Sequence, residues 1–334
     1  MIKPQYIVES TLVPHSAFIE AGARIERCMH NTINSPESAC VAIVGESRTG
    51  KSTVLDEFCR NHLEYRKEDG LYTPVLKVVT PSNPTVKGLA ELMLEKMGDP
   101  RYESGTEIAK TNRLKVLMRN SKTNMVVIDE FQHFCSRRNG VVAHHVADWL
   151  KTLVDENRCG LVVAGLPSGL AVLEQNEQLA GRFFTPMLMP RFDWRIDEHR
   201  EEFLGILGAF QGSIGRYFDI PRLDEEDMGF RVFRATGGLI GYLSKFLKYA
   251  VWGAIEGGQK VITLEGLRKA YQESIWDPNS PSDTANPFDK NYQPRHIEGQ
   301  IGIALNIGCA KLPNVLPRRK IPFSSDDQLV SGKF

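Results

Sequence analysis

One eight-residue run constrains this chain more than any other feature. The run Gly45-Glu46-Ser47-Arg48-Thr49-Gly50-Lys51-Ser52 fulfils every fixed position of a phosphate-binding P-loop. In such a loop the glycines let backbone N–H groups turn toward a phosphate, the lysine reaches the β- and γ-phosphate oxygens, and the serine hydroxyl becomes a Mg²⁺ ligand. We therefore expect a nucleoside triphosphate and Mg²⁺ here. The predicted binding residues are Gly45, Glu46, Ser47, Arg48, Thr49, Gly50, Lys51, Ser52 and Thr53.

The sequence on both sides of the loop has the strand-then-helix order that a P-loop requires. The apolar run 40–44 suits a buried parallel strand, and residues 52–60 begin an amphipathic helix. Short β-rich runs then alternate with helical periodicity, and they lie at 75–79, 125–128, 161–164 and 186–189. This alternation predicts an α/β fold, an αβα sandwich around a five-stranded parallel sheet.

Changes of pattern along the chain predict its domain boundaries. Strand signals stop near residue 190, helical spacing follows, and Thr263 is placed to cap the last helix. Beyond residue 276 prolines become frequent and apolar repeats are few. We expect an N-terminal extension over 1–38 whose helix at 16–30 packs on the next domain, a P-loop core over 39–190, a helical lid over 191–276 and a Pro-rich tail over 277–334. The tail is expected to be extended or disordered alone, and Asn286-Pro287-Phe288 and Arg318-Arg319-Lys320 are its candidate docking elements.

A second motif completes the predicted site. Four apolar residues at 125–128 precede Asp129 and Glu130. A carboxylate at the end of a strand neighbouring the P-loop strand holds Mg²⁺ through water, which is the role predicted for Asp129. Glu130 is placed to polarise the water that attacks the γ-phosphate. The guanine-reading motif Asn-Lys-x-Asp is absent from the sequence, so the pair predicts an ATPase whose cofactors are ATP and Mg²⁺.

Composition excludes several other classes. Lysine plus arginine equals aspartate plus glutamate at 41 each, so any DNA contact must be local. No apolar stretch approaches the roughly 18 residues of a membrane helix, and the N-terminus lacks a signal-peptide core, so we expect a cytoplasmic protein without a membrane partner. The cysteines and histidines have no zinc-site spacing.

The segment 176–183 lies before the last expected strand, where proteins of the AAA+ class carry an arginine finger. Arg182 is the candidate. A finger on the subunit edge would complete the neighbouring protomer's active site, so turnover would require oligomers. The alternative is a surface arginine in a salt bridge.

Together these motifs resemble the TnsC/TniB family of AAA+ regulators of DNA transposition. The resemblance spans about 36–275, and its matching segments are 45–52, 128–130, 177–183 and Ala-Thr-Gly-Gly-Leu-Ile-Gly-Tyr-Leu at 235–243. It implies assembly of the chain with itself, as a ring or a helical filament, around double-stranded DNA. It also implies that the assembly marks target DNA and recruits a transposase, linked to a target-selection protein.

The resemblance also suggests where DNA would bind. It assigns backbone contacts to the positions of Lys87 and Thr106. On the helix that follows, the spacing of the basic residues indicates a stripe. The stripe consists of Lys115, Arg119 and Lys122, at i, i+4 and i+7, and it lies beside Arg113 and Lys110. The alternative is that each of these residues belongs to a charged helix face that contacts only solvent.

Two departures from the family pattern concern the γ-phosphate. After the fourth strand only Ser168 could act as a polar sensor, and the lid carries Gly241-Tyr242, with Lys245 one turn later, where an arginine is common. We therefore expect slow hydrolysis, with ATP acting as an assembly switch. Two other functions stay open: a signalling or secretion ATPase with a protein partner, and an origin-recognition or loader-type AAA+ protein.

Overall fold

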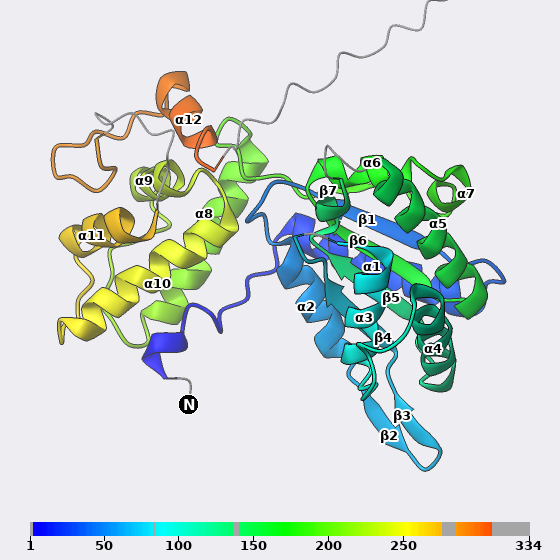
Figure 1. Cartoon of the computed structure of the whole chain (residues 1–334). Coiled ribbons are helices and arrows are strands. Elements are labelled where there is room, and N and C mark those ends of the chain that lie inside the picture. Colours follow the sequence, from blue (N-terminus) through cyan, green and yellow to red (C-terminus); the bar gives the residue numbers. More distant parts are fainter. Residues whose placement is uncertain (1–2, 83, 136–139, 276–284, 309–334) are drawn as a thin grey trace, which may run out of the picture.

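The structure is a computed structural model that describes residues 3–82, 84–135, 140–275 and 285–308. It contains a sheet domain and a helical lid, and the N-terminal segment runs between them (Figure 1). Among the described helices, none is both long and apolar enough to cross a membrane.

The sheet domain is built on a five-stranded parallel sheet, as the sequence predicted. Its strands are β1 (Cys40–Val44), β4 (Val75–Val79), β5 (Met125–Asp129), β6 (Gly160–Gly165) and β7 (Met187–Leu188). Their order is β4-β5-β6-β1-β7. The P-loop strand β1 therefore pairs with β6 and β7, and β6 separates it from β5. The prediction that Asp129 follows a strand adjacent to the P-loop strand was wrong, because β6 lies between the two strands and pairs with both β1 and β5.

Helices cover both faces of the sheet because alternate strand residues point to opposite sides. Val41 and Ile43 pack with one pair of helices, whereas Cys40 and Ala42 belong to the core on the other face. The first face carries α1 (Ser16–Asn34) and α2 (Lys51–Asn61). The second carries α3 (Val86–Lys96), α4 (Glu107–Asn120), α5 (Gly140–Asn157), α6 (Leu170–Leu173) and α7 (Glu177–Ala180).

Short elements join these layers. An antiparallel hairpin of β2 (Tyr65–Lys67) and β3 (Gly70–Tyr72) projects from the sheet domain (Figure 1). The 3₁₀ helices are η1 (Pro4–Tyr6), η2 (Phe131–Phe134) and η3 (Pro167–Gly169).

The lid has its own apolar core. It contains α8 (Asp197–Ile214), α9 (Glu226–Thr236), α10 (Ile240–Glu256), α11 (Leu264–Ser274) and α12 (Glu298–Leu305). Thr263 caps α11 as predicted, since its hydroxyl accepts from the Gly266 N–H at 3.2 Å. The N-terminal extension divides between the two domains: α1 packs on the sheet, but Ile7 and Val8 are buried in the lid core. The expected packing of the helix at 16–30 on the following domain is confirmed, whereas the contact of residues 7–8 with the lid was not predicted.

Residues 285–308 fold as part of the lid. The ring of Phe288 is 1% exposed and stacks on Phe246 with centroids 5.0 Å apart, while Ile301, Ala304 and Ile307 are also buried. The expectation of an extended tail was wrong for this stretch, and Phe288 is not exposed for docking a partner. The other candidate docking element, at 318–320, lies outside the described residues.

Candidate nucleotide site

The P-loop connects β1 to α2 and is held closely against the chain that follows β7. A β-carbon on Gly45 would lie 2.4 Å from the Met189 carbonyl oxygen, so only glycine fits there. Gly50 precedes α2 with φ +97°, a left-handed conformation that favours glycine. The loop glycines therefore have the structural roles that a phosphate cradle requires.

Lys51 lies at the centre of this cradle. Its side chain is 7% exposed, and Nζ donates to the carbonyl oxygens of Gly45 at 3.0 Å and Glu46 at 2.6 Å. Burial lowers the pKa of Lys51, and the negative charges of Glu130, Asp129 and Glu46 oppose this shift. The ammonium lies at the N-terminus of α2, where the backbone N–H groups also favour an anion. Both features therefore suit a bound phosphate.

The carboxylates lie at the end of β5. Asp129 is 3% exposed and its Oδ1 accepts from the Glu130 N–H at 2.8 Å. The Glu130 carboxyl is partly exposed and lines the same cavity as Lys51 and Ser52. A hydroxyl and a buried carboxylate are hard oxygen ligands of the kind Mg²⁺ prefers. The chemistry of these side chains therefore fits a nucleotide with Mg²⁺ held by Ser52 and Asp129.

A cavity of about 550 Å³ lies above the P-loop and is large enough for a nucleotide. The N-terminal segment and the lid form its other walls. The N-terminal residues are 8–13 with His15 and Phe18, and the lid residues are Ile206, Phe210, Ile240, Gly241 and Ser244. The phosphates of a bound nucleotide would meet the polar P-loop, whereas the base would face the apolar lid.

The lid contacts the P-loop directly. The Arg48 guanidinium lies over the Tyr242 ring, 4.5 Å from its centroid, and the Gly241 N–H donates to the Arg48 carbonyl oxygen at 2.9 Å. A β-carbon on Gly241 would come within 2.8 Å of the Arg48 β-carbon. Gly241 and Tyr242, the two lid residues at the position where an arginine is common, therefore both contact the P-loop.

Arg191, which sequence reasoning missed, is a second link. This buried guanidinium forms a forked ion pair with the Glu46 carboxylate through Nε and Nη2. Its Nη1 donates to the carbonyl oxygens of Gly237 at 3.2 Å, Leu305 at 2.9 Å and Ile307 at 3.1 Å. Arg191 thus joins the P-loop to α12. The available signal was an arginine three residues after the end of the last strand, but this residue belongs to no motif.

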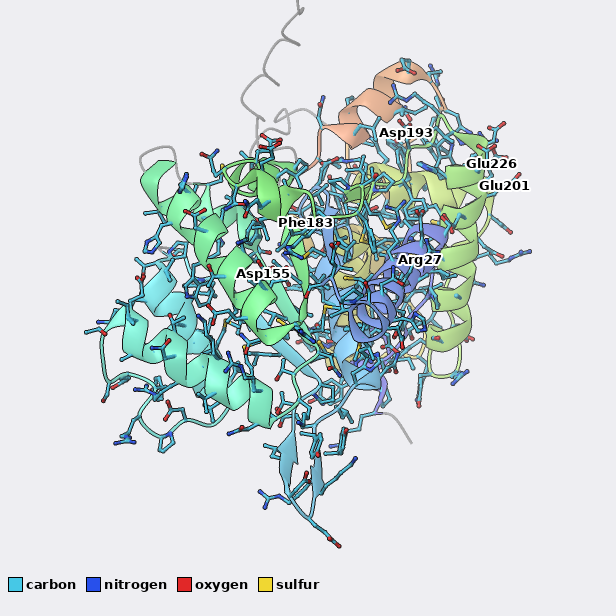
Figure 2. All side chains as sticks on the ribbon, turned by 90° about the vertical axis from the view of Figure 1, so that its right-hand side faces the viewer. Arg27, Asp155, Phe183, Asp193, Glu201 and Glu226 are labelled. Atoms are coloured by element: carbon cyan, nitrogen blue, oxygen red, sulfur yellow. The ribbon has the colours of Figure 1, made fainter. Side chains whose placement is uncertain are left out.

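Arg182 lies far from the P-loop of its own chain. Its carbonyl oxygen accepts from the N–H of Cys40, the first residue of β1, whereas the P-loop follows the last residue of β1. Its guanidinium pairs with Asp155 of α5 at 2.6 Å. Figure 2 labels Asp155 and Phe183, the neighbour of Arg182, on the face of the sheet domain turned to the viewer.

The candidate DNA-binding residues have different surroundings. Lys87 is exposed in the first turn of α3, and the exposed Thr106 caps α4 by accepting from the Ala109 N–H at 3.3 Å. Lys115 and Arg119 both lie near Glu156, at 2.9 and 3.9 Å. Arg113 pairs with Asp99 at 2.8 Å.

The expected basic stripe is not continuous. Lys110 is completely buried and pairs with Glu91 of α3, while Lys122 lies beyond the end of α4. The expectation that Lys110 lies on this basic face was wrong, because spacing alone did not reveal the neighbouring α3. Lys122 is exposed but does not continue the helical spacing of Lys115 and Arg119, because α4 ends before it.

Comparisons with known proteins agree with this architecture. No curated protein matches the chain. Similar solved structures include Cdc6p from Pyrobaculum aerophilum (14% identity, TM-score 0.61, covering 82% of this chain and 72% of that one). The ORC2 protein of Aeropyrum pernix in ADPNP-ADP complexes is also similar (16% identity, TM-score 0.57, covering 80% of this chain and 71% of that one). The ORC1 protein of that organism in complex with DNA is similar too (12% identity, TM-score 0.54, covering 82% of this chain and 71% of that one). These likenesses show the α/β P-loop fold. The sequence model described as "Bacterial TniB protein" matches residues 3–194, more than half of the chain, which therefore belongs to the TniB family.

Proposed function

We propose that this chain is an ATP-dependent regulator of DNA transposition that assembles on double-stranded DNA, marks the target and recruits a transposase under the direction of a target-selection protein. The observation that carries the ATP part is the single cavity shared by Lys51, Ser52, Glu130 and the lid. The family match supports the role in transposition.

The side chains at this cavity suit hydrolysis of ATP to ADP and phosphate. Lys51 would bind the β- and γ-phosphates, Ser52 and Asp129 would hold the metal, and Glu130 would polarise the attacking water. Bound Mg²⁺ would neutralise charge that develops on the phosphate oxygens. The chain's own contribution is mainly positioning and electrostatic stabilisation.

Arg182 is proposed to act on the neighbouring protomer. It lies at the amino end of β1 and the P-loop lies at the carboxyl end, and five strand residues span about 16 Å. This separation argues against a role at its own nucleotide. Engagement of a neighbour would require the guanidinium to leave Asp155. Hydrolysis is accordingly expected to be slow until oligomers form on DNA.

Lys87 is the strongest of the proposed DNA contacts, because it is exposed and, within the described residues, has no ion-pair partner. Thr106, Arg113, Lys115 and Arg119 remain weaker candidates, since each already has an intramolecular partner. One phosphate contact per protomer, repeated over an assembly, gives salt-dependent binding without a basic overall charge.

The test combines electron microscopy with fluorescence anisotropy of labelled duplex DNA. We expect rings or filaments with ATP and Mg²⁺ and none without nucleotide. Lys51→Ala is expected to abolish nucleotide binding and assembly. Lys87→Ala should weaken binding equally across DNA sequences and reduce the slope of log affinity against log salt. An intact ATPase that never assembles on DNA would instead favour the signalling or secretion alternative.

The origin-recognition alternative has one specific observation in its favour, the fold shared with ORC and Cdc6 proteins. We rank it second because the TniB match rests on the sequence itself. Stimulation of transposase-catalysed strand transfer in a purified system would separate the two.

A further inference from the structure

The side chain of Gln132 bridges Glu130 and the end of β6. Its Nε2 donates to Oε2 of Glu130 at 2.5 Å, and its Oε1 accepts from the Leu166 N–H at 2.9 Å. Gln132 belongs to η2, which directly follows Glu130. The amide thus connects the proposed catalytic carboxylate to the strand that separates β5 from the P-loop strand.

Gly165, the last residue of β6, makes room for this bridge. A β-carbon there would lie 2.1 Å from Oε1 of Gln132 and 3.1 Å from the Phe131 nitrogen. Any side chain at position 165 would therefore occupy the space that the Gln132 amide fills. The amide of Gln132, which comes from the segment after β5, therefore lies against the end of β6.

We propose that Gln132 is a positioning residue for hydrolysis, one that holds the Glu130 carboxylate toward the nucleotide cavity and ties its orientation to β6. This inference rests on the proposed ATPase function. Burial alone does not fix the orientation of the Glu130 carboxylate, because 43% of this side chain is exposed. A hydrogen bond to a carboxylate is stronger than one between neutral groups, so it restricts the rotamers of this side chain.

The hydrogen bond from Gln132 also leaves Glu130 able to act as a base. Gln132 occupies Oε2, so Oε1 can accept a proton from water. The nearby His133 does not replace the amide, because its Nε2 lies 3.8 Å from the same Oε2, which is too far for a hydrogen bond. Lys51 supplies the positive charge that faces the carboxylate from the P-loop.

The test measures kcat and KM for ATP hydrolysis by the full chain with duplex DNA, together with direct binding of a fluorescent ATP analogue. A positioned general base contributes about 10²–10⁴-fold, and loss of orientation alone should remove about tenfold of it. Gln132→Ala and the isosteric Gln132→Glu are therefore expected to lower kcat about tenfold, with analogue affinity changed less than about twofold.

Two further comparisons distinguish positioning from a general effect on folding. In a Glu130→Gln background, Gln132→Ala should cause no further loss, because both changes remove the same function. Gly165→Ala should displace the amide and reproduce the loss, and combining it with Gln132→Ala should add nothing. His133→Ala, a change in the same 3₁₀ helix, is the matched control and should keep kcat within about twofold.

The outcomes separate this inference from the proposed function. A wild-type chain that neither binds the analogue nor hydrolyses ATP would overturn the proposed function. A wild-type chain that hydrolyses ATP, alongside a Gln132→Ala variant with unchanged or raised kcat, would overturn only the role of Gln132. An additive loss in the Glu130→Gln background would do the same.

Discussion

Replacing Arg191 by methionine should measure how strongly the P-loop and the lid are held together. The bonds from Nη1 to the Gly237 and Ile307 carbonyl oxygens are buried. A hydrogen bond from a charged donor contributes about 1.5 kcal/mol, so these two together give about 3 kcal/mol. The ion pair with Glu46 adds less, because that carboxyl side chain is 38% exposed and water can replace the guanidinium. Methionine fills most of the arginine stem's volume, so little cavity forms.

The assay is urea-induced unfolding, followed by the fluorescence of the tryptophans, of which Trp194 is buried in the lid core. We expect Arg191→Met to lower the free energy of unfolding by about 3 kcal/mol without a change in the urea slope. Arg191→Lys keeps the charge but lacks the fork, so it should fall between wild type and Arg191→Met.

The matched control is Arg60→Met, because the Arg60 side chain is 61% exposed and pairs only with Glu57 among the described residues. It should cost less than about 0.5 kcal/mol. Equal effects of Arg191→Met and Arg60→Met would refute the reasoning, since they would show that burial and the three carbonyl partners contribute nothing.

Three further predictions concern pH, the lid and the proposed finger. Burial lowers the pKa of His15 from its usual 6.5, and Glu202 only partly offsets this shift, so the stability that neutral His15 contributes is present above about pH 6.5 and is lost as pH falls. Between about pH 7.5 and about pH 5.5 the unfolding free energy should fall less in His15→Gln than in wild type, and an equal fall would contradict the assignment. Phe288→Ala removes a buried ring and should destabilise the lid by about 3–5 kcal/mol, whereas no change in chemical denaturation would mean that 285–308 does not pack on it. Asp155→Asn weakens the ion pair that holds Arg182 within its own chain, and such a pair contributes up to about 1 kcal/mol. The guanidinium should then engage a neighbour more readily, so DNA-stimulated hydrolysis should rise about two- to fivefold, and Arg182→Ala must abolish this increase. A decrease would show that the ion pair supports turnover.

The parallel sheet could be predicted, and the centre of the candidate nucleotide site could be located, because their signals are local. The P-loop glycines, Lys51 and the pair Asp129-Glu130 lie in short motifs whose geometry is fixed by a few neighbouring residues. The alternation of apolar runs and helical spacing was sufficient for the parallel sheet. The order of strands was not, because pairing across β6 depends on contacts between segments far apart in sequence.

Other features were missed because their partners are distant or their composition is misleading. Arg191 acquires its role only when Glu46 and the end of α12 meet it in space. The frequent prolines after residue 276 concealed a short helix, although Ile301 and Leu305 are spaced four residues apart as one helical face requires. Lys110 resembled a surface residue until α3 covered it.

If Arg182 completes the site of a neighbouring protomer, as proposed, its placement at the opposite end of β1 from the P-loop limits the symmetry of the active assembly. An interface that joins the Arg182 end of one chain to the P-loop end of the next is heterologous. Such an interface repeats head to tail and either closes into a ring or continues as a helix. In an open helix the chain at one terminus has no neighbour to supply an arginine, and complete sites are one fewer than chains. In a closed ring the two numbers are equal. Hydrolysis per chain should consequently increase with the length of an open assembly and be constant for rings.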